Sequence, residues 1–338
     1  MTKLFLHIGP HKTGSTYIQK YLFSNRDQLL ELGLSYPNVG VGPQYGHHKV
    51  FEKVKALEQK ELDEYMVPFF GNDAITFVSS EKFDRLKLGD IEKLSKSLAD
   101  LDVRIIYFHR NYIDLLPSWW QERVKHKSRI SFYEFALPHI LRPFSSNIIN
   151  PGIVLDLYAQ VFGKDKITVV DYDAAVQKDG ILRPIFELLS IEFGVVKNEV
   201  VNRSLKLELV EIIRALNTIA ELNGQLRSHD VRAIFLRKRR EEAICSEVES
   251  LAAIIREHMK PLKLARGFFA NAVNATFRKK YESCFFNHWL NDLPIREVFV
   301  PSDTWMLEGD AVETCEHIYQ HIMTGDILEA ERRSLVLT

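Results

Sequence analysis

The sequence has few of the features that mark secreted, membrane-spanning or zinc-binding proteins. It contains only 3 cysteines in 338 residues, at positions 245, 284 and 315. Cysteines this sparse exclude a disulfide framework and a cysteine zinc site, and they suit a reducing compartment. No apolar run approaches the roughly 18 residues that a transmembrane helix needs, and the first run, 4–8, is too short for a signal peptide. We therefore expect a cytoplasmic protein with no transmembrane segment.

Charge of neither sign predominates in the chain. Lysine and arginine total 44 and aspartate and glutamate total 45, so the formal net charge is −1. Proteins that bind nucleic acid usually carry a basic excess, so we expect no nucleic-acid partner. Apolar residues make up 46% and charged residues 26%, a composition that excludes a disordered chain, a collagen and a coiled coil. A local cationic pocket is still compatible with this balance.

Short apolar runs alternate with helical segments in the first part of the chain. The runs are rich in Val, Ile and Phe without alternation, which is typical of strands buried on both faces of a parallel sheet. We predict strands at 3–8, 74–78, 103–108 and 167–172. Helices are expected at 15–32, 47–66, 89–100, 111–127, 131–142, 151–162 and 180–191. This order predicts an α/β fold with a parallel β-sheet flanked by helices.

The pattern changes after about residue 200, where we expect a helix-rich C-terminal region. The predicted helices are 205–222, 239–259, 261–269, 277–290 and 309–323, with no strand among them and an extended loop at 299–305. We therefore divide the chain into an α/β core at 1–200 and a helical region at 201–338. We expect this helical region to pack on the core and contribute to a substrate pocket.

A glycine-containing loop follows the first predicted strand and leads directly into a helix. It reads Gly-Pro-His-Lys-Thr-Gly-Ser-Thr over residues 9–16. Glycines permit a tight turn, and successive backbone N–H groups beside a helix N-terminus attract an anion. The loop is therefore a candidate phosphate cradle formed by His11, Lys12, Thr13, Gly14, Ser15 and Thr16. The alternative is a simple turn that joins a strand to a helix.

The position of the lysine separates this loop from that of a nucleoside triphosphatase. In that class a lysine immediately follows the second glycine, whereas here Ser15 takes that place and Lys12 precedes Gly14 by two residues. The third strand also ends in Arg110, where such enzymes often place an aspartate that supports Mg²⁺. An arginine beside a phosphate loop favours bidentate phosphate recognition. Ser118 follows Arg110 by eight residues, two turns along the next helix.

Together these motifs resemble those of the sulfotransferases that use 3′-phosphoadenosine 5′-phosphosulfate (PAPS). Among these enzymes, the motifs are most similar to those of bacterial and glycan-type members. The family loop has a proline where this chain has His11, and the family arginine motif has a proline where this chain has Tyr112. The resemblance implies a P-loop-like fold and PAPS as sulfate donor, with the bisphosphate PAP as product and no metal required. It also implies that Arg110 and Ser118 hold the 3′-phosphate. Tyr172 stands at the end of the fourth predicted strand, where the family has a tyrosine that lies near the adenine.

Two residues are the candidate catalytic groups. The resemblance and the loop place Lys12 where it neutralises the leaving oxygen. Glu81 follows the second predicted strand, where glycan-type members of the family carry a glutamate base, and we expect burial to raise its pKa toward neutrality. An alternative is that Ser79 or Ser80 caps a helix and Glu81 is only a first-turn acid. Histidines at 11, 47 and 48 are further candidates for the base.

The expected function is sulfuryl transfer from PAPS to a hydroxyl or amine of an acceptor, with a carbohydrate or glycolipid favoured. An ATP-dependent P-loop kinase or NTPase is one alternative, and a non-catalytic nucleotide-binding relative is another. Trp119 and Trp120 offer a surface for stacking on a sugar, although one of the two is expected in the core. The basic run at 237–240 indicates either a solvated helix face or an acidic acceptor.

Overall fold

The computed structural model describes residues 2–70, 75–178, 180–192, 205–225, 230–261, 268–286 and 298–336. The chain forms two compact units. The first comprises residues 1–115, 142–202 and 268–294, and the second comprises 116–141, 203–267 and 295–338. Each unit is therefore assembled from separate segments of the sequence. No helix in the described ranges combines the length and the apolar character needed to cross a membrane.

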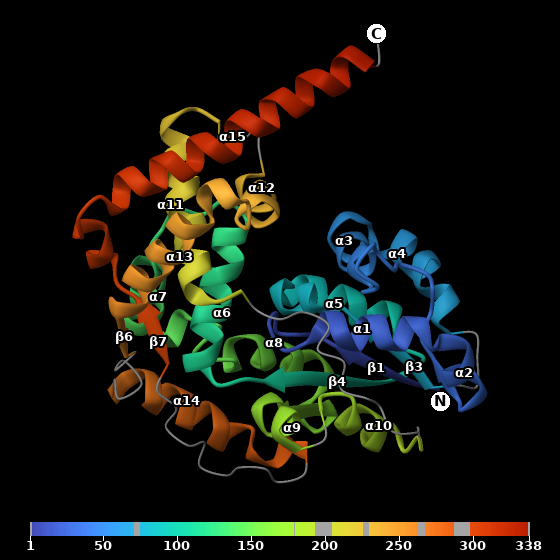
Figure 1. The fold of residues 1–338 in the computed structure, drawn as a ribbon. Helices are drawn as coiled ribbons and strands as arrows, with labels where there is room; N and C mark the ends of the chain where they lie inside the picture. The colour runs from blue at the N-terminus through green and yellow to red at the C-terminus, as the bar shows by residue number, and fades with distance from the viewer. Residues whose placement is uncertain are drawn as a thin grey trace. The chain divides into compact units, whose positions relative to one another are not determined.

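The first unit is built on a five-stranded sheet in the order β2-β3-β1-β4-β5. Strands β1, β3 and β4 of this sheet are labelled in Figure 1. Its strands are β1 (Lys3–His7), β2 (Leu34–Ser35), β3 (Ile75–Ser79), β4 (Asp102–His109) and β5 (Ile167–Asp171). All four pairings are parallel. The α/β class predicted from the sequence is confirmed. Only β2 escaped prediction, because two residues carry no recognisable pattern.

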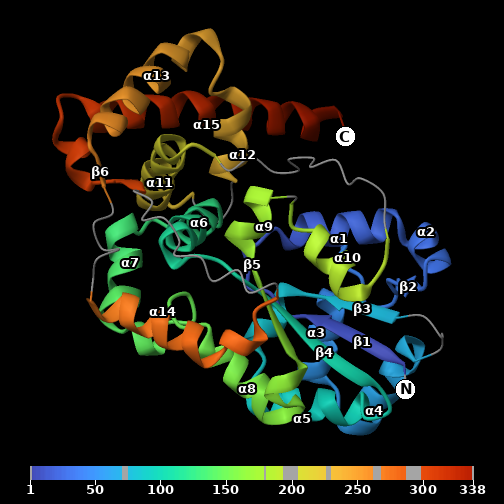
Figure 2. The same cartoon turned by 90° about the horizontal axis from the view of Figure 1, so that it is seen from below.

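Helices cover both faces of this sheet, as Figure 2 shows. Leu4 and Leu6 of β1 face one apolar cluster, and Phe5 faces the other, as the period-two geometry of a strand requires. The first face is covered by α3 (His48–Ala56), α4 (Gln59–Met66), α5 (Leu88–Ser97), α8 (Gly152–Phe162) and α14 (Phe268–Lys280). The second is covered by α1 (Ser15–Ser24), α2 (Arg26–Glu31), α9 (Tyr172–Lys178) and α10 (Arg183–Leu189). Short 3₁₀ turns complete the unit: η1 (Val67–Phe69), η2 (Glu81–Arg85), η3 (Pro143–Ser145), η4 (Lys164–Lys166) and η6 (Glu282–Cys284).

The second unit is mainly helical. It contains most of α6 (Tyr112–Lys125), with α7 (Phe132–Leu141), α11 (Leu207–Leu222), α12 (Val231–Lys238), α13 (Glu242–Glu257) and α15 (Ala311–Val336). Helix α11 is buried along most of its length, and its contacts include α12, α13 and α15. Within the basic run at 237–240, Lys238 is buried and its Nζ donates to the Ile322 carbonyl at 3.0 Å. This lysine therefore ties α12 to α15, whereas Arg237 and Arg240 are exposed.

Several predicted elements after residue 200 are wrong. The sequence predicted no strand there, but β6 (Met259–Pro261) and β7 (Phe299–Pro301) pair antiparallel. Each has three residues and a proline, so neither shows a strand pattern, and the pairing joins segments far apart in the chain. The helix predicted at 277–290 instead begins at Phe268 and ends at Lys280. Of the helix predicted at 261–269, Pro261 belongs to β6 and 262–267 lie outside the described residues.

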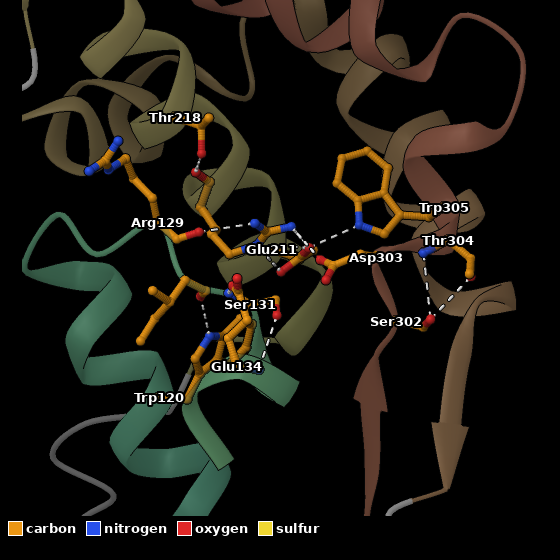
Figure 3. A network of polar contacts seen from close by, with 12 residues as sticks. Trp120, Arg129, Ser131, Glu134, Glu211, Thr218, Ser302, Asp303, Thr304 and Trp305 are labelled. Atoms are coloured by element: carbon orange, nitrogen blue, oxygen red, sulfur yellow. Dashed lines mark hydrogen bonds and ion pairs between the residues drawn. The ribbon is translucent and has the colours of Figure 1, made fainter. Parts of the chain in front are cut away.

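A buried ion pair anchors the second unit (Figure 3). The Arg214 guanidinium donates to both carboxylate oxygens of Glu211, at distances between 2.6 and 3.0 Å. It also donates to the Arg129 carbonyl at 3.0 Å and to Asp303 at 2.7 Å. The indole N–H of Trp305 donates to Glu211 at 2.9 Å. Because its members come from three segments, this network joins the loop before α7, helix α11 and the turn η8 (Asp303–Leu307).

Arg214→Met is expected to destabilise the protein by about 3–5 kcal/mol, because it leaves the buried Glu211 carboxylate without its counter-charge. Adding Glu211→Gln to that variant removes the stranded charge and should recover part of the loss. Urea unfolding monitored by tryptophan fluorescence gives both free energies. Arg240→Met, at an exposed position, is the matched control. An Arg214→Met protein as stable as this control would contradict the structural role of the pair.

His109, the last residue of β4, is buried in an apolar pocket of the first unit. Its ring stacks on Phe277 at 5.3 Å between centroids and contacts the edge of Phe285 at 5.9 Å. Neither ring nitrogen has a hydrogen-bond partner among the described residues. Burial, with a smaller contribution from Arg278, lowers its pKa from 6.5 to about 3. The folded protein therefore holds this imidazole neutral.

His109→Phe is expected to reduce the loss of stability in acid. Between pH 6.5 and pH 3 the unfolded chain binds a proton at this histidine and the folded chain does not, so folding weakens as the pH falls. The variant has no histidine to protonate at this position. Its free energy of unfolding, relative to that of the wild type, should therefore rise by up to about 1.4 kcal/mol for each pH unit below the unfolded pKa. Urea unfolding of both proteins across this range provides the measurement. A difference that does not change with pH would contradict a neutral buried His109.

Candidate active site

Four functional candidates follow the carboxyl ends of four adjacent strands. The glycine loop with Lys12 follows β1, Glu81 follows β3, Arg110 follows β4 and Tyr172 follows β5. Since these strands lie in the order β3-β1-β4-β5 and run parallel, the sheet brings all four segments to one edge. Ligands of open α/β sheets bind at this edge, where the strand order reverses. The edge is therefore the candidate active site.

The loop after β1 adopts a conformation that depends on its two glycines. Gly9 and Gly14 have φ values of 105° and 75°, and Lys12 has a φ of 71°, which is rare for a residue with a side chain. A Cβ at Gly14 would collide with Cδ1 of Ile181. The buried Thr13 donates its hydroxyl to the Pro10 carbonyl at 2.7 Å and so closes the turn. Sequence and structure agree that this loop is built for a tight turn.

Helix α1 starts at the end of this loop and has no side-chain cap. It begins at Ser15, its first turn contains no acidic residue, and the preceding Gly14 is left-handed. The positive end of the helix is therefore not neutralised by a carboxylate of its own first turn. Ser15 is buried and Thr16 is half-buried. The start of α1 has the electrostatic character that an anion site requires.

Arg110 connects the end of β4 to the loop. Its Nη1 donates to the Lys12 carbonyl at 2.6 Å, and its guanidinium lies over the Tyr172 ring at 5.1 Å from the centroid. Its Nε is buried and has no hydrogen-bond partner in the described part of the chain. Tyr172 also lies close to Gly14, since a Cβ there would be 3.6 Å from the tyrosine ring. Arg110, Tyr172 and the loop thus form one contiguous group.

Other predicted site residues are not brought into this group by the described contacts. Ser118 is half-buried on α6 and belongs to the second unit, so its part in the site stays a prediction. Trp119 is half-buried, whereas Trp120 is fully buried and donates its indole N–H to the Ile130 carbonyl at 3.0 Å. Trp120 is therefore the tryptophan of the pair that belongs to the core.

Glu81 begins the turn η2, and the capping geometry considered from the sequence is present. Ser80 caps the turn, because its hydroxyl accepts from the Lys82 backbone N–H at 3.3 Å. Glu81 itself is only 6% exposed, so it is not a solvated first-turn acid. A Cβ at Gly9 would lie 3.2 Å from the Glu81 backbone, so η2 lies directly against the loop after β1.

The Glu81 carboxylate is surrounded by polar side chains from three other segments. Gln19 on α1 donates to Oε2 at 2.8 Å. Nδ1 of His11 lies 3.7 Å from Oε1, and Nε2 of His48 on α3 lies 3.9 Å from the same oxygen. The expectation that burial raises the pKa of Glu81 is wrong. Burial alone would raise it, but His48, the Gln19 hydrogen bond and His11 together lower the pKa below its ordinary value.

The histidines around Glu81 are held in their neutral form. Burial lowers the pKa values of His7, His11 and His47 to about 4, and it also lowers that of His48. Sequence reasoning named three of these histidines as candidates, and the structure brings His11 and His48 to Glu81. It missed Gln19, since a glutamine on an amphipathic helix carries no functional signal. Its only indication was its place one turn after Ser15, on the buried side of α1.

Across the described ranges, no group of three or more His, Cys, Asp or Glu side chains is arranged to hold a metal ion.

The sulfotransferase domain family matches residues 3–207, which is more than half of the chain. The matched segment contains the loop after β1, Glu81, Arg110, Ser118 and Tyr172. No curated protein and no solved structure matches the chain. The match covers the five-stranded sheet and all the strand ends at which the candidate residues lie. The chain therefore belongs to the PAPS-dependent sulfotransferase family.

Proposed function

We propose that the enzyme transfers the sulfuryl group of PAPS to a hydroxyl of a carbohydrate or glycolipid, with Lys12 and Glu81 as its catalytic residues. One observation carries this proposal: the parallel sheet holds Lys12 at the end of β1 and Glu81 at the end of the adjacent β3, with Gly9 packed against the Glu81 backbone. A cationic group for the leaving oxygen and a carboxylate for the acceptor proton are thus neighbours. Sulfuryl transfer in general follows from family membership.

The residues at this edge fit the two ends of the donor. The uncapped start of α1 and the tight loop suit the 5′-phosphosulfate, through His11, Lys12, Thr13, Gly14, Ser15 and Thr16. Arg110 has a buried Nε without a partner among the described residues, and an unsatisfied donor of this kind favours an anionic ligand. We assign Arg110 and Ser118 to the 3′-phosphate and Tyr172 to the adenine.

Lys12 stabilises the charge that develops as the sulfur–oxygen bond to the phosphate breaks. When bound, the donor supplies the sulfuryl group and a phosphate leaving group. By analogy with phosphoryl transfer, the transition state is loose and places negative charge on the bridging oxygen. The Lys12 ammonium, supported by the positive end of α1, is the group of this loop suited to neutralise that charge. Arg110 fixes the loop by binding the Lys12 carbonyl.

Glu81 accepts the proton of the acceptor hydroxyl as the new sulfur–oxygen bond forms. Its lowered pKa keeps it ionised at neutral pH, so the carboxylate is ready to take the proton. A lowered pKa also makes Glu81 a weaker base, so it takes the proton late, when the bond from the hydroxyl oxygen to sulfur has begun to form and has made the hydroxyl acidic. Glutamate at this position is typical of glycan-type members, which supports a carbohydrate acceptor. A cytoplasmic location stays a prediction.

The donor assignment predicts that the protein binds PAP in preference to ATP. Lys12→Ala and Arg110→Ala should each weaken PAP binding by about tenfold to a hundredfold, the cost of one charge-assisted hydrogen bond. Isothermal titration calorimetry measures both affinities. Lys20→Ala, at an exposed position on α1, is the matched control and should bind PAP like the wild type.

Adenosine 5′-monophosphate separates the two ends of the donor site. If Arg110 and Ser118 hold the 3′-phosphate, Arg110→Ala and Ser118→Ala should weaken PAP more than they weaken this nucleotide, which lacks that phosphate. Equal losses for both nucleotides would overturn the 3′-phosphate assignment. Preferential, Mg²⁺-dependent binding of ATP would contradict the PAPS site and support the kinase alternative.

Glu81→Gln is expected to lower kcat by about a hundredfold or more while PAP affinity stays within about twofold, because a general base typically contributes 10²–10⁴-fold. The measurement is transfer of labelled sulfate from PAPS to a panel of glycans, glycolipids, lipid alcohols and phenols, followed by mass spectrometry. Full activity of the variant would exclude Glu81 as the base. Transfer only to phenols or simple alcohols would exclude the carbohydrate acceptor.

A further inference from the structure

The Glu81 carboxylate is contacted by three side chains that carry no charge at neutral pH. Gln19, His11 and His48 come from α1, the loop after β1 and α3, and none of them carries a charge at neutral pH. A carboxylate with so little exposure to solvent needs partners, since an uncompensated buried charge is costly. The identity and direction of these partners therefore decide what Glu81 can do.

The tautomer of His11 is fixed by Arg85. Nη2 of Arg85 lies 3.0 Å from Nε2 of His11, and a guanidinium can only donate, so this Nε2 must be the acceptor. In the neutral ring the proton then lies on Nδ1, the nitrogen 3.7 Å from Glu81 Oε1. This separation is longer than a hydrogen bond, but it directs an N–H dipole at the carboxylate. His11 stands where the family loop has proline, so this contact is a property of this chain.

His48 contacts both Ser80 and Glu81. Its Nδ1 lies 2.8 Å from the Ser80 hydroxyl oxygen, which also accepts from the Lys82 backbone N–H. Its Nε2 lies 3.9 Å from Glu81 Oε1. In the tautomer in which the Ser80 hydroxyl donates to Nδ1, Nε2 carries the ring proton and directs an N–H group at the carboxylate.

Gln19 holds the other oxygen. Its Nε2 donates one hydrogen to Glu81 Oε2 at 2.8 Å and lies 3.1 Å from the Ser79 hydroxyl, which accepts the second. The amide cannot rotate to exchange its nitrogen and oxygen without placing an oxygen against the carboxylate. The side chain is fully buried, and a Cβ at Gly46 would be 2.8 Å from its carboxamide atoms. Gly46 therefore packs against the Gln19 carboxamide and restricts the side chain to one conformation.

We propose that Gln19, His11 and His48 are positioning residues that hold the Glu81 carboxylate in one orientation for proton acceptance, with Gln19 making the strongest contact. This inference rests on the proposed function of Glu81 as the base. Both oxygens of Glu81 are engaged from the side of the protein by groups that supply hydrogen bonds or N–H dipoles but no mobile proton. The carboxylate stays ionised without a salt bridge, so its remaining lone pairs are available to the acceptor hydroxyl.

Other ionisable groups also act on this carboxylate and enter the pH dependence. Glu81 interacts electrostatically with Asp84 on its own turn, with His7 on β1 and with Tyr36, which follows β2. Further charges face its histidine partners: Lys12, Lys82, Arg85 and Glu52. None of these makes a hydrogen bond to the Glu81 carboxylate among the described residues, so changes at Gln19 and His48 test the proposal most directly.

The test is the titration of the Glu81 carboxyl, followed by ¹³C NMR of protein labelled at glutamate side-chain carbons and assigned by comparison with Glu81→Gln. In the wild type the carboxyl should titrate below its ordinary value. Gln19→Met, which keeps the volume and removes the donor, should raise the midpoint by about one pH unit, because one hydrogen bond to a carboxylate is worth about that much. Gln28→Met, at an exposed position on α2, is the matched control and should leave the midpoint unchanged.

His48 offers a matched pair of variants. Both variants remove the charge through which His48 lowers the pKa of Glu81, so both should raise the midpoint. His48→Gln keeps an N–H donor near the position of Nε2, so it should raise the midpoint less than His48→Phe does. In sulfate transfer, Gln19→Met and His48→Phe should lower kcat about tenfold with KM for PAPS unchanged, and the acid limb of the kcat profile should move up with the NMR midpoint. His48→Gln should recover most of the activity.

The NMR titration and the sulfate-transfer assay test the positioning role and the proposed function separately. A Glu81 midpoint that is the same in Gln19→Met, His48→Phe and the wild type would overturn the positioning role, whatever the enzyme transfers. A shifted midpoint with an unchanged kcat profile would also overturn it, since Glu81 would then be oriented without consequence for catalysis. If the wild type transfers no sulfate while the NMR midpoint shifts as expected, the proposed function fails and the hydrogen-bonded arrangement stands.

Discussion

The parallel pairing of β3, β1 and β4 is the constraint on which the site depends. Parallel strands end at the same edge, so a register that pairs Leu6 with both Val78 and Ile105 brings the residues after each strand together. The loop after β1 lies between Glu81 on one side and Arg110 on the other. Arg110 then binds the Lys12 carbonyl, and Gly9 packs against the Glu81 backbone. Backbone register, rather than any local motif, therefore brings the loop that carries Lys12 next to Glu81.

Glu81 illustrates how burial and hydrogen bonding compete. Burial favours the protonated acid, and in an apolar pocket it would have produced a glutamate with a raised pKa. Here the hydrogen bond from Gln19 and the electrostatic effects of His48 and His11 favour the ionised form, and the pKa of Glu81 is lowered. The orientation of the carboxylate depends on Gln19, whose own position depends on helix α1 and on the close approach of Gly46.

The second unit uses the opposite solution for a buried acid. Glu211 is paired directly with Arg214, and all its neighbours in the network have partners (Figure 3). Such a pair adds little net stability over an apolar core, but removing one partner is costly, which suits a structural anchor. Nε of Arg110, at the candidate site of the first unit, is by contrast buried without a hydrogen-bond partner among the described residues.

The sequence by itself determined the α/β class, the four longer strands and the strand-end motifs, because these depend on local apolar runs and on spacing within single segments. It also led to the prediction of Lys12, Glu81, Arg110 and Tyr172 as site residues, from their places at strand ends and from the family resemblance. It did not reveal the β6–β7 pair, since three-residue strands take their stability from a distant partner. Nor did it reveal Gln19 or the direction of the Glu81 pKa, since both arise from contacts between segments far apart in the chain. The types of residue in the site were readable locally, whereas their orientations were decided only when the sheet brought the strand ends together.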